Sequence, residues 1–153
     1  MPYDDLRKGR VSLPNQIYSV TVTAHNRVPY FSDFQVGRLV VSEMRLLHDE
    51  EFLQSIAWVL MPDHLHWLFQ LGEKEDLPTV LKAFKAVSTK RINRVLKRRG
   101  LIWQRAYYDH AILKDEDIRA IARYIVANPL RAGLVPKIGQ YPLWDAMWLQ
   151  HRG

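Results

Sequence analysis

The stretch Met61-Pro62-Asp63-His64-Leu65-His66-Trp67-Leu68-Phe69 places two histidines, one residue apart, inside an otherwise apolar run. Successive side chains of a β-strand point to opposite faces, so His64 and His66 share one face, about 6 to 7 Å apart at their Cα atoms. The side chains of the opposite face, which can be buried, are Leu65, Trp67 and Phe69. The strand therefore presents two imidazoles on one face, and these predict half of a metal site.

The composition of the chain limits what else such a site can contain. Its 153 residues suffice for one domain with a hydrophobic core, and the hydrophobic fraction of 48% argues against disorder. There is no apolar run of membrane-spanning length and no apolar signal-peptide core near the N-terminus, so we expect a cytoplasmic protein that does not enter a membrane. Cysteine is absent, which excludes thiolate ligands. A metal must then be held by imidazole, carboxylate or amide groups.

The charge of the chain points to a polyanionic partner. A net charge of +6 and an isoelectric point near 9.7 favour nucleic acid, and aromatic residues offer faces on which unpaired bases can stack. From Lys82 to Arg99 no acidic residue interrupts the basic ones, which favours a phosphate-binding face over an ordinary solvated one. The residues that we expect to contact the nucleic acid are Arg7, Lys8, Arg10, Lys90, Arg91, Arg94, Trp103 and Arg105.

The hydrophobic periodicity predicts an α+β fold. Alternating patterns indicate strands over residues 17–24, 55–60, 64–71 and 107–113. Helical spacing indicates helices over residues 32–49, 79–98 and 115–128. A capping box that begins at Ser32 opens the first helix, and Gly100 ends the second.

This order of elements, β-α-β-β-α-β with a helix appended, predicts a ferredoxin-like (RRM-like) antiparallel sheet. Two helices should cover one face of the sheet, and the face with the two histidines should be the available one. We expect a single domain over residues 1–153, with a basic arm at residues 1–15 and a C-terminal tail at residues 135–153.

A third ligand can come from the last predicted helix. Tyr124 and Asn128 are four residues apart and would share one helical face. If this helix lies over the open face of the sheet, Asn128 supplies an oxygen ligand, which suits Mg²⁺ or Mn²⁺ with phosphate oxygens and water. Tyr124, one turn earlier, would then attack the bound phosphate and form a phosphotyrosine.

Other interpretations of the same residues stay open. A histidine pair in a strand is often structural, and Asn128 can be a helix stop before Pro129. A zinc hydrolase that uses His64, His66 and a carboxylate such as Asp109 satisfies the spacing, and a non-catalytic RRM-like module that stacks bases on its sheet fits the same fold. Tyr107 and Tyr108 are rival nucleophiles. The histidines ranked below the pair are His25, His48, His110 and His151.

Four motifs, taken together and in order, resemble those of one known family. Residues 61–66 resemble the His-hydrophobe-His motif of the HUH nucleases. With Trp103-Gln104-Arg105, Tyr108-Asp109-His110 and the segment 124–134, the chain resembles the REP-associated tyrosine transposases, relatives of the single-tyrosine insertion-sequence transposases. The resemblance covers roughly residues 15 to 145.

The resemblance implies a ferredoxin-like HUH fold and a definite chemistry. Members of the family cut single-stranded DNA without ATP, form a 5′-phosphotyrosine, leave a free 3′-OH and can rejoin strands. Their substrates are repetitive extragenic palindromes, which are hairpins with a short guide sequence at the foot. Carried over by position, His64 and His66 match the metal histidines, Tyr124 the nucleophile and Asn128 the third ligand. Members of this branch are generally monomers, and we expect a monomer here.

Overall fold

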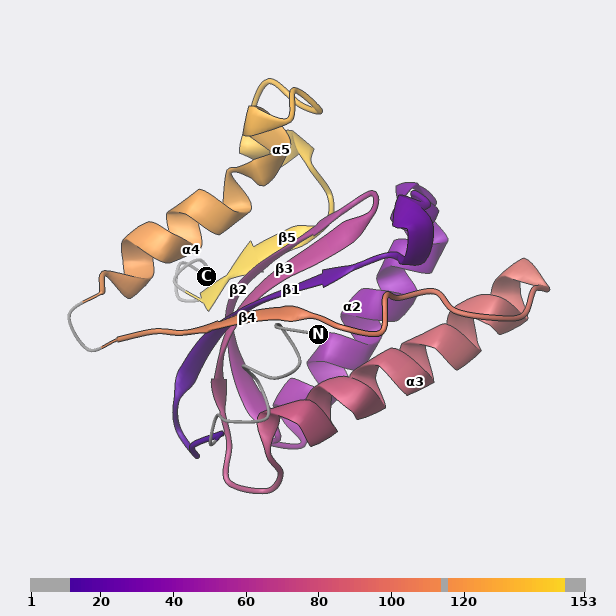
Figure 1. The fold of residues 1–153 in the computed structure, drawn as a ribbon. Coiled ribbons are helices and arrows are strands. Elements are labelled where there is room, and N and C mark those ends of the chain that lie inside the picture. Colours follow the sequence, from indigo (N-terminus) through magenta and orange to yellow (C-terminus); the bar gives the residue numbers. More distant parts are fainter. Residues whose placement is uncertain (1–11, 114–115, 148–153) are drawn as a thin grey trace.

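The computed structural model describes residues 12–113 and 116–147, which form one sheet with helices on both of its faces (Figure 1). The strands are β1 (Ile17–Thr23), β2 (Leu53–Met61), β3 (His64–Leu71), β4 (Tyr108–Ala111) and β5 (Trp144–Ala146). The helices are α2 (Phe34–Asp49), α3 (Leu77–Leu96), α4 (Ile118–Val126) and α5 (Asn128–Arg131), with short 3-10 turns at His25–Arg27, Tyr30–Ser32 and Ile138–Gln140. In the described part of the chain, no helix is both long and apolar enough to span a membrane.

The sheet confirms the predicted ferredoxin-like fold class. Its strand order is β4-β1-β3-β2-β5, and all neighbouring strands are antiparallel. The first four strands have the ferredoxin-like order, which places β3, with both histidines, in the interior of the sheet. The region predicted as a C-terminal tail contributes a fifth strand, because Trp144–Ala146 pair with β2 along its outer edge.

The two faces of the sheet have separate hydrophobic cores. On one face, α2 and α3 pack over a core that contains Leu65, Trp67 and Phe69, as the alternation predicts (Figure 1). On the other face, α4 packs over a smaller core that contains Leu68 of β3 with Ala122 and Ile125 of α4. The histidine face is therefore only partly available, because α4 covers a portion of it.

The helix ends differ in detail from those predicted. Asp33, rather than Ser32, caps α2, because its carboxylate accepts hydrogen bonds from the amides of Gln35 and Val36 at 2.9 and 3.4 Å. Helix α3 ends at Lys97, which adopts a left-handed conformation with φ of 54°, before Gly100 is reached. The observed N-terminus of α2 and the observed C-terminus of α3 lie within a few residues of the predicted ones, which is the usual accuracy of a sequence pattern.

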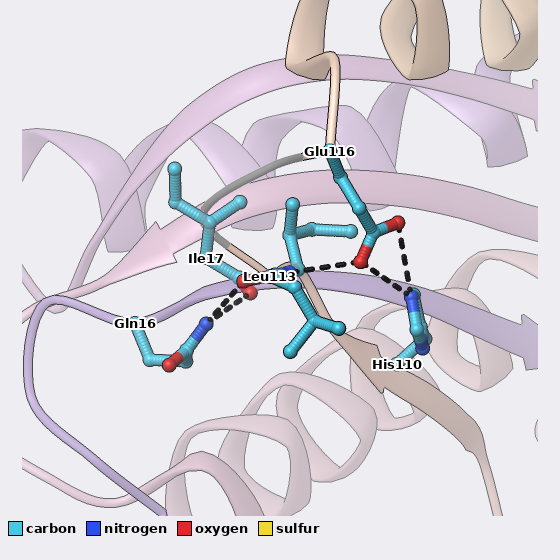
Figure 2. Close-up of polar contacts among 6 residues, drawn as sticks. Gln16, Ile17, His110, Leu113 and Glu116 are labelled. Carbon is cyan, nitrogen blue, oxygen red and sulfur yellow. Dashed lines mark hydrogen bonds and ion pairs between the residues drawn. The ribbon is translucent and has the colours of Figure 1, made fainter.

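The connection from β4 to α4 is held by a small polar cluster (Figure 2). The Glu116 carboxylate accepts a hydrogen bond from the amide of Leu113 at 2.8 Å and lies 3.2 Å from His110 Nε2. Glu116 thus folds back onto β4 instead of joining the first turn of the helix. Asp117 caps α4 by accepting a hydrogen bond from the amide of Ala120 at 3.1 Å. Gln16 ties the same region to β1 by donating to the Ile112 carbonyl at 2.9 Å (Figure 2).

Candidate metal and nucleophile site

His64 and His66 lie side by side on the α4 face of β3. Their ring centroids are 5.4 Å apart and the ring planes meet at 71°. Leu65 between them is fully buried against the opposite core. The alternation of the strand has therefore separated the two imidazoles from the apolar side chains, as the sequence predicts.

Asp63 orients the first histidine. Nδ1 of His64 donates to the Asp63 carboxylate at 2.8 Å, which leaves Nε2 of His64 available as a ligand. Arg27 donates to the same carboxylate at 3.2 Å. Burial alone raises the pKa of Asp63, but the hydrogen bonds from His64 and Arg27 outweigh this effect and hold it below its ordinary value. The sequence alone does not predict this role of Asp63, because its position next to His64 is the only local signal.

The environment of His66 keeps its imidazole neutral. Burial, followed by the positive charges near it at His64 and Arg131, lowers the pKa of His66 from 6.5 to about 4. Nδ1 of His66 is buried and has no hydrogen-bond partner among the described residues. A neutral imidazole with an unsatisfied nitrogen is the form in which histidine binds a metal.

Asn128 is the first residue of α5, after a break in the helix at Ala127. Pro129 lies in the first turn of this new helix instead of ending the old one. Nδ2 of Asn128 is buried without a hydrogen-bond partner among the described residues. The nitrogen and oxygen of an amide exchange places on a flip, so the same position can present an oxygen to a cation.

The buried polar atoms without a hydrogen-bond partner provide a test of whether His64, His66 and Asn128 fit a divalent cation. Buried polar atoms normally have a partner, and here one atom of His66 and one of Asn128 lack one. Two imidazoles and one amide oxygen form a donor set that leaves room for phosphate oxygens and water on Mg²⁺ or Mn²⁺. The residues present therefore fit the expected ion.

Tyr124 lies on the exposed flank of α4, with 63% of its surface accessible. The guanidinium of Arg131 lies flat against the phenol, with its central carbon 3.8 Å from the ring centroid. Arg131 also contributes to the positive charge near His66, so it lies close to both the tyrosine ring and His66. The sequence does not predict this contact, because it depends on how the chain continues after the break at Ala127.

Asp109 cannot join the site, which excludes a zinc hydrolase that uses this carboxylate. Asp109 pairs with Val20 of β1, and Val20 pairs with Trp67, so these three side chains point toward the α2–α3 core. Asp109 is 6% exposed there, on the opposite face of the sheet from His64 and His66. Among the described residues, no group of three or more histidine, aspartate or glutamate side chains is arranged to hold a metal.

The basic residues predicted to contact DNA are not gathered in one place. Lys90 and Arg94 are exposed on α3, which lies across the sheet from the histidines (Figure 1). Arg91 turns toward α2, where it lies 3.8 Å from the Glu43 carboxylate. Arg105 and Lys82 are exposed at a groove of about 600 Å³ between α3 and the segment before β4. The residues Arg7, Lys8 and Arg10 lie outside the described part of the chain.

Trp103 is a core residue, so its predicted contact with nucleic acid is wrong. It is 2% exposed, with its ring 4.8 Å from Phe31 and 5.6 Å from Phe84. Its indole nitrogen donates to the Ser88 hydroxyl at 2.9 Å. A tryptophan that is enclosed and hydrogen-bonded in this way cannot offer a face to a base.

Two of the remaining histidines have polar partners of their own. Nδ1 of His48 accepts a hydrogen bond from the amide of Ser55 at 3.1 Å, and His110 interacts with Glu116. His25 lies in a 3-10 turn, and its amide donates to the Ile102 carbonyl. His151 is outside the described residues. Of the two rival tyrosines, Tyr107 is buried at 7% exposure and Tyr108 is exposed on the histidine face.

The chain belongs to the IS200-like transposase family. Residues 12–128 match the family model described as Transposase IS200 like. Within this family, the resemblance to the REP-associated tyrosine transposases is confirmed by two relatives. One, a candidate REP-associated tyrosine transposase of Haemophilus influenzae (strain Rd), is 27% identical over 141 residues, 82% of this chain and 77% of that protein. The other, a REP-associated tyrosine transposase of Escherichia coli (strain K12), is 29% identical over 123 residues, 80% of this chain and 71% of that protein.

Two solved structures share the fold. The structure of a REP-associated tyrosine transposase bound to a REP hairpin superposes with a TM-score of 0.72 at 24% identity, over 88% of this chain and 79% of that chain. The crystal structure of a candidate transposase from Deinococcus radiodurans gives a TM-score of 0.55 at 21% identity, over 78% of this chain and 95% of that chain.

Proposed function

We propose that this protein is a metal-dependent endonuclease and strand transferase that cuts single-stranded DNA through a 5′-phosphotyrosine. The single observation that carries the proposal is that buried atoms of His66 and Asn128 have no hydrogen-bond partner among the described residues, together with the oriented His64 on the same strand face as His66. Membership in a transposase family supports the same chemistry. We take hairpin DNA of the REP type as the substrate, because a protein of the same fold was solved with a REP hairpin.

The proposed reaction exchanges one phosphoester for another. The Tyr124 oxygen, after loss of its proton to solvent, attacks phosphorus in line with the bond to the 3′-oxygen. That bond breaks, the 3′-oxygen takes a proton from solvent, and the 5′-phosphate stays on the tyrosine. His64, His66 and Asn128 would hold a divalent ion, which would supply Lewis-acid polarisation of the phosphoryl oxygen. Attack by the free 3′-OH of another strand reverses the exchange and joins DNA.

Arg131 has two functions in this proposal. Its stacking on Tyr124 limits the positions that an exposed side chain can adopt, which brings the phenol closer to one reactive orientation. The N–H groups in the plane of the guanidinium have no hydrogen-bond partner among the described residues, so they are available to a DNA phosphate. Arg131 and Tyr124 contact each other within one chain, and the two histidines belong to the same chain. We further propose that a monomer contains the complete site.

The test is covalent capture of a labelled hairpin with a single-stranded flank, in the presence of Mn²⁺, on a denaturing protein gel. We expect an adduct with the unaltered protein and none with Tyr124→Phe, His66→Ala or added EDTA. Tyr108→Phe is the matched control, because it removes the hydroxyl of the other exposed tyrosine and should leave the adduct intact. An adduct with Tyr124→Phe would show that the nucleophile is another residue.

Arg131 is tested by separating binding from chemistry in single-turnover reactions. Arg131→Ala should slow adduct formation at saturating DNA by about tenfold or more, since positioned phosphate clamps contribute on this scale. Arg131→Lys should recover part of the DNA affinity but little of the rate, because lysine keeps the charge without the stacking plane. Equal rates for all three proteins would remove Arg131 from the mechanism.

A further inference from the structure

Helix α4 leaves part of the histidine face of the sheet open. It packs mainly against β2, β3 and β5. Near β1 and β4, the described residues that share its hydrophobic core lie at the end that contains Ile17 and Ile112. The rest of the β1–β4 half of this face is lined by the half-buried hydroxyl side chains of β1, Ser19, Thr21 and Thr23, and by exposed side chains of β4.

The strand register places one of these β4 side chains in line with the metal site. Thr21 of β1 pairs with His66 of β3 on one side and with Tyr108 of β4 on the other. Paired residues of antiparallel strands point to the same face, so the three side chains form a row across the sheet. Two strand spacings separate the ends of this row, which puts the backbone of Tyr108 about 10 Å from that of His66.

Tyr108 is unusually exposed for a residue in a strand. It presents 64% of its surface, whereas its neighbours on the other face, Tyr107 and Asp109, are 7% and 6% exposed. Its ring is therefore little used by the hydrophobic core. Along the same face of β4, His110 interacts with Glu116 (Figure 2), which places a carboxylate toward the Ala111 end of the strand, away from the Tyr108 end. A polyanion would therefore approach the histidines from the Tyr108 end.

We propose that Tyr108 is a stacking platform for an unpaired base of the single-stranded DNA, within a few nucleotides of the phosphate that is held at the histidine pair. This inference rests on the proposed function for the identity of the ligand. A flat, accessible ring beside small hydroxyl groups suits a nucleotide, because the ring takes the base and the hydroxyls of Thr21 and Thr23 can donate to phosphate or sugar oxygens. The Tyr108 ring would not stack in this way on double-stranded DNA, because the bases of a duplex are already stacked on one another.

The experiment measures binding without cleavage. The protein carries Tyr124→Phe and is titrated without a divalent ion against a REP-type hairpin with 2-aminopurine at successive positions of its single-stranded flank. Stacking quenches the fluorescence of this base analogue. We expect quenching at one or two neighbouring positions. Tyr108→Ala should abolish it and weaken binding of the flanked hairpin by roughly 5- to 150-fold, the range for loss of one stacked base.

Two further variants separate stacking from other roles of the side chain. Tyr108→Phe and Tyr108→Trp keep a ring and should keep both the quenching and the affinity. Phe34→Ala is the matched control, since Phe34 is also an exposed aromatic residue, 47% accessible, on α2 across the sheet. Phe34→Ala should change neither the affinity for the flanked hairpin nor the quenching of 2-aminopurine.

Three results would overturn the inference. The first is unchanged affinity and quenching in Tyr108→Ala, and the second is equal weakening of binding to a blunt hairpin that has no single-stranded flank. The third is loss of the covalent adduct in a Tyr108→Phe protein that retains Tyr124, which would make Tyr108 the nucleophile. If the unaltered protein forms no adduct, the proposed cleavage chemistry fails, but Tyr108-dependent quenching would still support the stacking platform.

Discussion

His64 and His66 are neighbours on one strand, but the protein holds them in different ways. His64 is oriented by a hydrogen bond to Asp63, whereas His66 is kept neutral by burial and has an unsatisfied nitrogen. The period of the strand is a local property, so the sequence predicts that the two rings share a face. The contact of Arg131 with Tyr124 depends on how the chain continues after Ala127, and a single helical pattern does not contain that information.

Asp63 should contribute to the metal affinity of the site, because it orients His64. Removal of an outer carboxylate that orients a ligating histidine typically costs 10- to 100-fold in metal affinity, so Asp63→Ala should weaken Mn²⁺ binding by about that factor. Isothermal titration with MnCl₂ measures it. Arg27→Ala is the control, because Arg27 contacts the same carboxylate from the exposed side and should have a smaller effect. Equal affinities for Asp63→Ala and the unaltered protein would mean that His64 needs no orienting partner.

At the scale of elements, the pattern predicts the long helices and strands better than their ends. Helices α2 and α3 were predictable because each buries a regular apolar stripe. Strand β5 was not predictable, because its three residues are too few to show an alternation. It pairs with β2, which lies far from it in the sequence, so no local pattern indicates the pairing. The cap at Asp33 lay one residue from the predicted one, because serine and aspartate satisfy helix amides equally well.

The end of β3 depends on a glycine. A Cβ atom on Gly72 would lie 2.6 Å from the carbonyl oxygen of Glu51 and 3.0 Å from that of Phe52, and backbone atoms cannot easily move away. We expect Gly72→Ala to reduce the free energy of unfolding by about 1 to 3 kcal/mol, as measured by urea denaturation. Gly139→Ala is the control, because nothing lies within 4 Å of its added Cβ. A stable Gly72→Ala protein would require that the β3–α3 loop can shift.

The contact between α2 and α3 includes a buried carboxylate. Burial raises the pKa of Glu43 above its ordinary value of 4.5, although Arg91 partly opposes the shift. The folded chain therefore binds this proton more tightly than the unfolded chain does. The stabilisation from Glu43 is complete below pH 4.5 and is lost as the pH rises through the folded-state pKa.

Replacement of this carboxylate by an amide should therefore stabilise the protein at neutral pH. We expect Glu43→Gln to melt at a higher temperature than the unaltered protein at pH 7, with a smaller difference at pH 4, where the Glu43 carboxyl is largely protonated. Glu75→Gln, an exposed position, should change the melting temperature little at either pH. A lower melting temperature for Glu43→Gln at pH 7 would mean that the Arg91 ion pair outweighs the cost of burial.

At the scale of the whole molecule, the candidate site and the basic helix lie on opposite faces of the sheet. The histidines face α4, whereas Lys90 and Arg94 project from α3 (Figure 1). Charge alone predicts that these residues attract a polyanion, but not where they lie relative to the cut. Lys90 and Arg94 can therefore contribute to the affinity for a long or folded DNA without contributing to the chemical step.

This separation predicts a selective effect of salt. A Lys90→Ala, Arg94→Ala double variant should reduce the slope of log affinity against log salt by about 2 for a full hairpin. Its rate of adduct formation with a saturating short single strand should stay unchanged. Fluorescence anisotropy from low to moderate salt measures the slope. An unchanged slope would show that the DNA does not reach α3.

The location of the histidines on an interior strand also determines how often each part of the site opens. Amide protons of β3 are hydrogen-bonded to strands on both sides, so we expect them to exchange with deuterium only when the whole domain unfolds. Helix α4 has only nine residues and one packed side, so its amides should exchange through openings of lower free energy. Exchange followed by mass spectrometry would separate the two classes. The ligands would then form the fixed half of the site, and the helix of Tyr124 the half that can release its product.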